Sequence, residues 1–166
     1  MTGICLLDGS FHAFGDELPP IEVIASSLAH INRFTGHAGP YSVAQHCVLA
    51  SMFIDDDTLR LSALLHDAPE AIYGDISSPL KRLLGGGALE RLENHYHDAV
   101  DTAYGVQTRH PLVKECDGRL LITEAKSFGI WCEEFPDFRQ YPYVIKRWPA
   151  AYARKAFLKR FEVLTK

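Results

Sequence analysis

The strongest local signal in this chain is a run of apolar helical residues that leads directly into a histidine and an aspartate. Residues 64–70 read Leu-Leu-His-Asp-Ala-Pro-Glu, and the residues just before them have the spacing of a buried helix. Burying an imidazole and a carboxylate beside leucines costs free energy unless each has a strong partner. Pro69 also lacks the N–H that would bond to the carbonyl of Leu65, and its ring disfavours a regular helix. We therefore predict a loosened helix in which His66 and Asp67 converge on one point.

Two further polar residues lie in apolar segments with helical spacing. His46 lies in a helix predicted over residues 42–53, where Ser42 and the residue three positions later have the spacing of a capping box. Asp117 lies in a helix predicted over 111–130. Taken singly, either residue would be interpreted as an ordinary core or surface group. Beside an adjacent His-Asp pair, they complete a set of nitrogen and oxygen ligands.

We interpret this set as the ligands of one divalent transition metal per chain. Imidazole and carboxylate groups suit several such ions, so Zn, Co, Mn, Ni and Fe all stay open. The predicted ligands are His46, His66, Asp67 and Asp117. Glu124 follows the last ligand by seven residues and so lies on much the same helix face, where it is a candidate to support the ligands.

The order and approximate spacing of these four residues resemble the H…HD…D signature of the HD-domain metal-dependent phosphohydrolases. Four surrounding segments resemble the small bacterial and phage branch, which includes the bacterial 5′-deoxynucleotidases and a phage dATP triphosphohydrolase. These segments are Ile-Asn-Arg-Phe-Thr-Gly-His at 31–37, Tyr-Ser-Val-Ala-Gln-His at 41–46, Ala-Leu-Leu-His-Asp-Ala-Pro-Glu-Ala at 63–71 and Gly-Asp-Ile-Ser-Ser-Pro-Leu-Lys at 74–81. The resemblance covers residues from about 20 to about 130.

The resemblance implies roles for residues around the predicted ligands. Glu70 and Asp75 match acidic residues that orient or deprotonate the attacking water. Arg33 matches an arginine that grips a substrate phosphate, and its planar set of donors suits that task. Phe34 takes the place of an aromatic residue that packs against the sugar, where tryptophan is usual.

Several other residues are candidates for contacts with the substrate, and some of them also have a competing structural interpretation. His37 follows Arg33 by one helical turn and is a candidate for the phosphate or the rim of the site, and Lys81 can add a point charge. Ile21 and Pro79 are candidates for apolar contacts to the base, with core packing and a turn as the competing roles. Other cations that are either phosphate contacts or ordinary surface charges are Arg82, Arg109, Lys114, Arg119 and Lys126.

The expected function is a metal-dependent phosphohydrolase of deoxynucleotides. Within the resemblance we favour hydrolysis of dATP, and also of dADP or dAMP, to deoxyadenosine and phosphates, which would deplete the dATP pool. The alternatives are a 5′-deoxynucleotidase that acts on dNMPs, an HD cyclic-nucleotide or alarmone hydrolase, and a non-catalytic nucleotide sensor. A two-metal hydrolase needs additional histidines between His66 and Asp117. His95 and His97 lie in that interval, but their charged helix favours a surface role.

Composition limits the partners. The formal net charge is −4 with no basic stripe, which argues against a nucleic-acid polymer. No apolar run is long enough to span a membrane. The four cysteines lack C-x-x-C pairing and are expected to be reduced, mostly buried thiols of a cytoplasmic protein, in the host cytoplasm if a phage encodes it. The resemblance also implies a homo-oligomer.

The fold is expected to be all-α: a single HD-domain helical bundle over 1–166 with a short N-terminal β-hairpin. Hydrophobic residues make up 47% of the chain, enough for one sizeable core. An irregular packed segment rich in proline and aromatic residues is expected over 133–148. The predicted hairpin lies within 4–14, and helices are predicted at about 21–33, 42–53, 58–73, 79–84, 88–104, 111–130 and 149–164.

Overall fold

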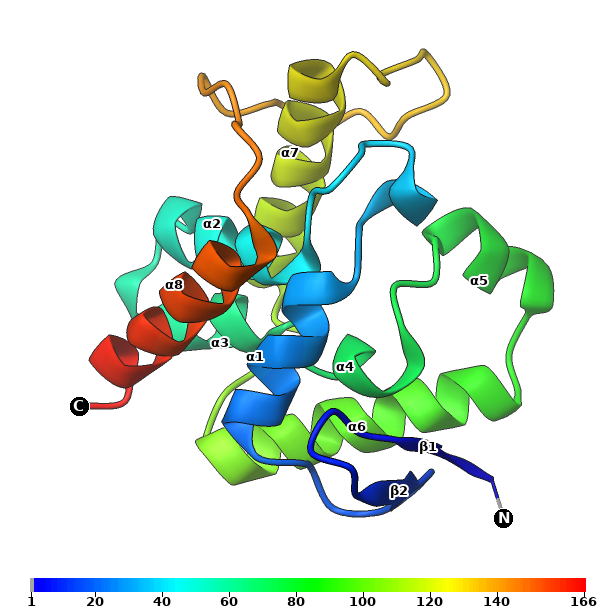
Figure 1. The fold of residues 1–166 in the computed structure, drawn as a ribbon. Helices are drawn as coiled ribbons and strands as arrows, with labels where there is room; N and C mark the ends of the chain where they lie inside the picture. Colours follow the sequence, from blue (N-terminus) through cyan, green and yellow to red (C-terminus); the bar gives the residue numbers. More distant parts are fainter. Residues whose placement is uncertain (1) are drawn as a thin grey trace.

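A computed structural model describes residues 2–166 of the protein, and it is mostly helical with a short antiparallel hairpin (Figure 1). The hairpin strands are β1 (Gly3–Cys5) and β2 (Phe11–Ala13). His12 Nε2 lies 2.7 Å from the Tyr96 hydroxyl, so the hairpin is attached to the long helix that contains Tyr96. The predicted helical class and the hairpin are confirmed.

The helix α2 (Val43–Phe53) lies at the centre of the molecule. Its residues 43–51 are all buried, and it packs against α1 (Ile21–His30), α3 (Arg60–Leu65), α7 (Pro111–Phe128) and α8 (Ala150–Leu164). One apolar cluster lies between α2, α1 and α8, and a second lies between α2, α7 and the segment that precedes α8. His46 is fully buried on this central helix, so the packing of two cores determines its position.

The capping box predicted at the start of α2 is confirmed only in its first half, the hydrogen bond to Ser42. The Ser42 hydroxyl accepts a hydrogen bond from Gln45 N at 3.2 Å, as expected at an N-terminus. The Gln45 side chain does not return to the cap, however. Its amide donates to Lys146 O at 2.7 Å and accepts from Trp148 N at 2.8 Å. These two bonds fasten the irregular segment before α8 to the centre of the fold.

The helix predicted over 58–73 is interrupted at the His-Asp pair. A turn of 3-10 helix, η2 (Asp57–Leu59), leads into α3, and α4 (Glu70–Tyr73) begins after the break. Between them, Ala68 N donates to Leu65 O at 3.0 Å and Glu70 N donates to Asp67 O at 3.0 Å. These tighter i to i+3 bonds replace the bond that Pro69 cannot donate. The predicted loosening is confirmed.

The segment after α1 differs from its prediction, because the helix expected to reach residue 33 ends at His30. Ile31 is extended, and Arg33 N donates to Tyr41 O at 2.9 Å, so Arg33 lies in a loop tied to the start of α2. A short 3-10 turn, η1 (Phe34–Gly36), follows, with Phe34 and Thr35 at positive φ. Such backbone is unfavourable for residues other than glycine, and neighbouring structure must hold it.

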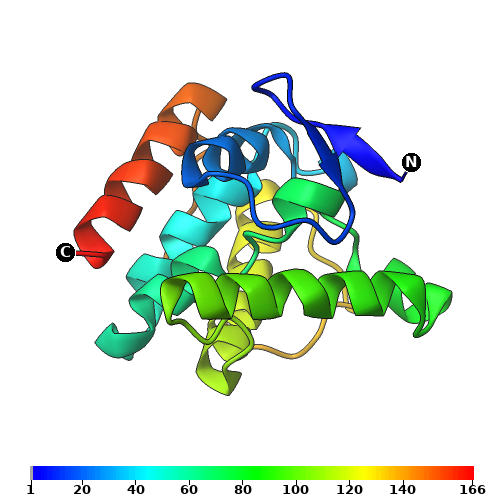
Figure 2. The same cartoon turned by 90° about the horizontal axis from the view of Figure 1, so that it is seen from below.

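The remaining helices are α5 (Ser78–Leu84) and α6 (Ala88–Tyr104). Figure 2 shows α6 running across one end of the bundle beside the hairpin. Residues 133–148 form no helix or strand, as predicted, and Tyr141 and Ile145 within them are buried. Of the helices described over 2–166, none has the length and apolar character that crossing a membrane requires. The expectation of mostly buried cysteines is wrong for Cys5 and Cys132, which are exposed.

Candidate metal centre and cleft

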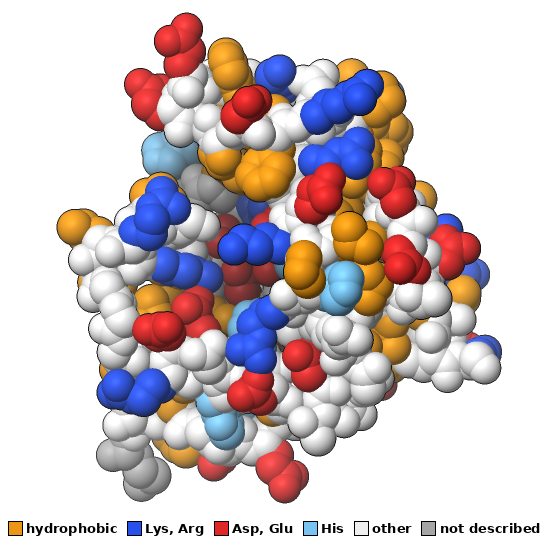
Figure 3. All heavy atoms as spheres, turned by 180° about the vertical axis from the view of Figure 1, so that it is seen from behind, with side chains coloured by type: hydrophobic (Ala, Val, Ile, Leu, Met, Phe, Trp, Pro, Cys, Tyr) orange, Lys and Arg blue, Asp and Glu red, His pale blue; other side chains and the backbone are white. Residues whose placement is uncertain are grey.

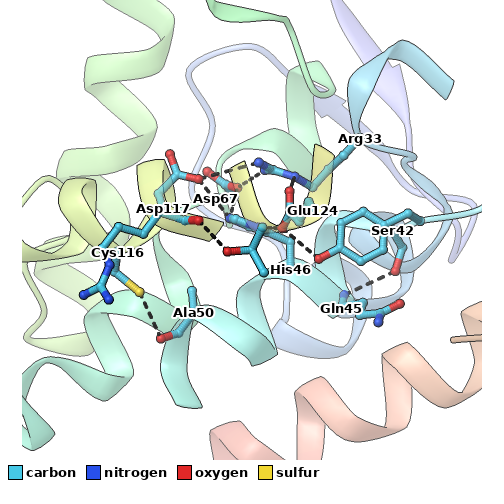
Figure 4. Close-up of polar contacts among 12 residues, drawn as sticks. Arg33, Ser42, Gln45, His46, Ala50, Asp67, Cys116, Asp117 and Glu124 are labelled. Carbon is cyan, nitrogen blue, oxygen red and sulfur yellow. Dashed lines mark hydrogen bonds and ion pairs between the residues drawn. The ribbon is translucent and has the colours of Figure 1, made fainter. Parts of the chain in front are cut away.

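The four predicted ligands converge at one point, and Figure 4 labels three of them, His46, Asp67 and Asp117. His46 Nε2 lies 3.2 Å from His66 Nε2 and 3.1 Å from Asp117 Oδ1. Asp67 Oδ2 lies 3.3 Å from His66 Nε2 and 3.6 Å from His46 Nε2. The distance between His66 Nε2 and Asp117 Oδ1 is 4.0 Å. Residues from α2, the turn after α3, and α7 therefore present their nitrogen and oxygen atoms to a single small volume.

The outer nitrogens of both histidines are already engaged. His46 Nδ1 lies 2.6 Å from Glu124 Oε1, and His66 Nδ1 lies 2.7 Å from Ala63 O. Since a carboxylate and a carbonyl only accept hydrogen bonds, both Nδ1 atoms carry the proton. When both imidazoles are neutral, which is the form that can bind a metal, the two Nε2 lone pairs face each other and two carboxylates. Acceptor atoms grouped in this way repel one another unless a cation lies between them.

The spacing of these atoms fits a metal ion. With bonds of about 2.0–2.1 Å to nitrogen or oxygen, two donors on a tetrahedral ion lie roughly 3.3–3.5 Å apart. His46, His66 and Asp117 form a group that could hold an ion, and their ligand atoms lie within 4.8 Å of one another. Asp117 Oδ1 is buried and has no hydrogen-bond partner among the described residues. The residues present therefore fit the cofactor that the sequence predicts.

Glu124 contacts the predicted ligand His46 and two further residues, Tyr41 and Arg33. It is fully buried, accepts from the Tyr41 hydroxyl at 2.7 Å and pairs with Arg33 Nε at 3.1 Å, in addition to its bond with His46. Burial acts to raise the pKa of Glu124, but the positive charges of Arg33 and His46 outweigh it and lower the pKa. Glu124 is therefore an ionised carboxylate that orients the His46 ring, as the sequence suggested.

Arg33 contacts the predicted ligands directly. Its guanidinium lies 3.3 Å from Asp67 Oδ2 and 3.6 Å from Asp117 Oδ1. Burial opposes the charge, yet Glu124 and the two aspartates raise the pKa of Arg33 further above its ordinary value. The buried arginine thus offsets carboxylate charge at the centre.

Glu70 and Asp75, the predicted candidates for proton transfer, follow the His-Asp pair in the chain, and neither is among the residues that line the described cleft. Burial, followed by the charges of Asp67 and Asp75, raises the pKa of Glu70 well above its ordinary value. Burial is also the main cause that raises the pKa of Asp75. Carboxyl groups whose pKa values are raised by burial and neighbouring charge are candidates for general acid–base chemistry.

An open cleft of about 450 Å³ extends from the ligands toward α5, α6 and the start of α7. Figure 3 shows a hollow with acidic side chains inside it and Lys and Arg side chains around its rim. Lys81 lines the cleft and pairs with Glu93 at 2.6 Å, and Arg109 pairs with Asp98. The residues that line the cleft are His66, Asp67, Lys81, Glu93, Asn94, His97, Thr108, Arg109, Val113, Lys114 and Asp117.

Several predicted contacts lie elsewhere. Ile21 packs against the apolar cluster between α1 and α8, which supports its core role, and Pro79 is exposed in the first turn of α5. His37 is exposed after the 3-10 turn. Phe34 packs near Phe135 with ring centroids 6.5 Å apart. None of these four is among the residues that line the described cleft.

Of the five cations that were candidates for phosphate contacts, two line the cleft and three do not. Arg109 and Lys114 line the cleft. Arg119 lies over the Tyr141 ring at 4.0 Å, and Lys126 lies over the Trp131 ring at 5.2 Å, so both have other partners. Arg82 is exposed on α5.

His97 and Cys47 are the metal-ligating side chains near the centre and cleft that the sequence did not predict there. His97 was expected at the surface, but it is half-buried and lines the cleft, where its Nδ1 lies 3.0 Å from the Thr108 hydroxyl. Cys47 forms a second possible metal-binding group with His66 and Asp67. Its position directly after His46 was the available sequence signal for Cys47. No local sequence signal could place His97 at the cleft, because tertiary packing determines which face of α6 meets it.

In the metal-free protein, His46 is predicted to make stability pH-dependent. Burial and Arg33 act to lower the pKa of His46, but Glu124 and Asp117 outweigh them and raise it from 6.5 to about 9. A raised pKa means that protonated His46 stabilises the fold, fully below pH 6.5, and that this contribution is lost as the pH rises through about 9. We expect the free energy of unfolding to fall by up to about 3 kcal/mol across this range.

Urea unfolding of metal-free protein at pH 6.5 and about pH 10 measures this change, with His46→Gln as the control that should reduce it. A wild-type free energy of unfolding that is the same at both pH values would contradict the raised pKa of His46.

Searches with family models found no match to this chain. It is 40% identical over 112 residues to the uncharacterized protein YfdR of Escherichia coli K12, an alignment that covers 66% of this chain and 61% of the relative. It is 37% identical over 95 residues to the uncharacterized protein RCAP_rcc00048 of Rhodobacter capsulatus, which covers 52% of this chain and 48% of that relative. The matched segments thus span about three fifths and about half of these relatives.

Proposed function

We propose that this protein is an HD-type metal-dependent phosphohydrolase of deoxynucleotides, and that dATP is its preferred substrate. The observation that carries the proposal is the convergence of two imidazole nitrogens and two carboxylate oxygens, with donor separations of 3.1–4.0 Å. The preference for dATP follows from the resemblance of residues 31–37 and of the Ser-Ser-Pro turn at 77–79 to the phage branch of that family.

One divalent transition metal per chain is part of the proposal. Such an ion would supply a water of lowered pKa and offset the charge of a phosphoryl oxygen. His46, His66, Asp67 and Asp117 would hold it, and Glu124 would keep the His46 ring oriented through the 2.6 Å bond to Nδ1.

The surrounding residues supply proton transfer and phosphate binding. Glu70 and Asp75 are carboxyl groups that can accept the proton of an attacking water beside the ligands. Arg33, once an ion shares Asp67 and Asp117, can turn its donors to a substrate phosphate. The cleft adds Lys81, Arg109 and Lys114, and these cations suit a chain of several phosphates better than a single one.

The direct test is release of nucleoside and phosphates from dATP, dAMP, ATP and the other dNTPs with Co²⁺, Mn²⁺ or Zn²⁺ added. Metal-dependent conversion of dATP to deoxyadenosine, with weak turnover of ATP, is the expected result. Turnover of monophosphates alone would instead identify a 5′-deoxynucleotidase. Metal binding without turnover of any of these substrates would overturn the proposal.

Neutralising Glu70 is expected to separate catalysis from metal binding. Glu70→Gln removes a proton acceptor but none of the four predicted ligands, so turnover of dATP should fall by about 10²–10⁴-fold while one ion per chain is retained. Steady-state kinetics and elemental analysis of the same samples check both parts. Glu90→Gln, an exposed carboxylate on α6, is the matched control and should keep full activity.

A second candidate function is hydrolysis of a cyclic nucleotide or alarmone, and the location of His97 favours it. A second ion would need ligands between His66 and Asp117 in the chain, and His97 lines the same cleft. Two ions per chain, with loss of one in His97→Ala, would favour this candidate. One ion per chain in both proteins would favour the deoxynucleotide proposal.

A further inference from the structure

A buried thiol lies against the predicted metal ligands. Cys47 follows His46 on α2 and is 0% exposed. Its Sγ, one ring nitrogen of His66 and one oxygen of Asp67 lie within 4.8 Å of one another. His66 also belongs to the group formed with His46 and Asp117, so the two possible metal-binding groups share a ligand. The thiol therefore adjoins the centre and is not an isolated cysteine of the core.

A buried carboxylate without a partner supports a ligand at this position. Glu70 is 6% exposed, and its Oε2 is buried with no hydrogen-bond partner among the described residues. Glu70 N donates to Asp67 O at 3.0 Å, so this carboxylate follows Asp67 by one turn of the chain. A buried carboxylate oxygen that lacks a hydrogen-bond donor is expected to face a cation or water.

The separations are compatible with one ion that contacts sulfur as well as nitrogen and oxygen. With bonds of about 2.3 Å to sulfur and about 2.0–2.1 Å to nitrogen, the two donors on a tetrahedral ion lie roughly 3.5–3.6 Å apart. The ligand atoms of Cys47, His66 and Asp67 lie within 4.8 Å of one another, an upper bound that includes this separation. On coordination the thiol proton would pass to solvent, since a metal-bound cysteine is a thiolate.

We propose that Cys47 is a sulfur ligand of the metal centre. A thiolate favours borderline-soft ions such as Zn²⁺ and Co²⁺ over the hard ion Mn²⁺, so Cys47 determines which divalent metal this centre prefers. The inference rests on the metal-binding part of the proposed function and not on the substrate or the reaction.

Cobalt spectroscopy tests the assignment in a protein whose exposed thiols are removed by Cys5→Ser and Cys132→Ser. Titration of this metal-free protein with Co²⁺ should produce visible ligand-field bands together with a near-ultraviolet thiolate-to-cobalt charge-transfer band. Adding Cys47→Ser should abolish the charge-transfer band and keep the visible bands. Adding Cys116→Ser instead, which replaces the other buried thiol, should keep both.

Zinc-edge X-ray absorption gives a test that does not require replacement of Cys47. In a protein with serine at positions 5, 116 and 132, Cys47 is the one cysteine left, so a sulfur neighbour of zinc at about 2.3 Å would come from it. Cys47→Ser should lower the affinity for Zn²⁺ by about tenfold or more and leave that for Mn²⁺ nearly unchanged. Cys47→Ala is the second variant if serine disturbs folding.

The outcomes separate this inference from the proposed function. Cobalt binding without a charge-transfer band, or zinc with nitrogen and oxygen neighbours alone, would overturn the role of Cys47 and leave the four-residue centre intact. Absence of any metal binding would overturn both. Persistence of the charge-transfer band in Cys47→Ser would also exclude Cys47 as its source.

Discussion

Replacing Asp67 with asparagine is expected to abolish metal-dependent phosphate release from dATP. Asp67 Oδ2 lies within 3.6 Å of both histidine Nε2 atoms, and an amide in its place supplies no negative charge to a divalent ion. An ion that supplies several kcal/mol of transition-state stabilisation corresponds to a loss of at least about 10³-fold in kcat/KM. Steady-state kinetics with Co²⁺ or Mn²⁺ and elemental analysis of the same sample measure the two effects.

The matched control is Asp137→Asn, which changes an exposed aspartate in the irregular segment. It should retain both the metal and the activity. Asp67→Asn that still turns over dATP within about tenfold of the wild type would contradict a ligand role for this residue. The same result would remove the main chemical support for the phosphohydrolase proposal.

Replacing Glu124 with alanine is expected to cause the largest loss of stability. Glu124 is fully buried and bonds to Arg33, His46 and Tyr41. Its removal leaves the Arg33 Nε and the His46 Nδ1 without their buried acceptor, and breaking a buried ion pair from one side costs about 3–5 kcal/mol. Urea unfolding of the metal-free proteins at pH 7 measures this difference.

Two variants calibrate the result. Tyr41→Phe removes a single hydrogen bond to the same carboxylate and should cost about 1 kcal/mol. Glu115→Ala lies on the same helix at an exposed position and should change stability by less than about 0.5 kcal/mol. A loss below about 1 kcal/mol for Glu124→Ala would show that Arg33 and His46 do not depend on this carboxylate.

The break at the His-Asp pair could be predicted because its causes are local. Pro69 removes one hydrogen-bond donor, and a polar pair follows a leucine run, so neither cause depends on a distant part of the chain. Glu124 could likewise be placed beside the centre from its spacing to Asp117 on one helix. The four predicted ligands were identified from such local signals. They converge because the helices that contain them pack around the central helix α2.

Other features depend on contacts that no local pattern encodes. The helix expected to reach Arg33 stops at His30, because the chain pairs with Tyr41 and Ser42 instead of continuing the helix. His97 faces the cleft since the end of α6 packs beside Thr108, a residue outside that helix. Cys47 lies near His66 and Asp67 because α3 packs against α2, and this contact joins separate parts of the chain.

The most direct test of the metal centre is anomalous diffraction from crystals of the full chain grown with Co²⁺, recorded above and below the cobalt absorption edge. We predict one strong peak per chain among His46, His66, Asp67 and Asp117, with bonds of about 2.0–2.2 Å to nitrogen and oxygen. No peak at this position with cobalt in excess, or a peak only at surface side chains, would contradict the proposed centre and the hydrolase function that depends on it.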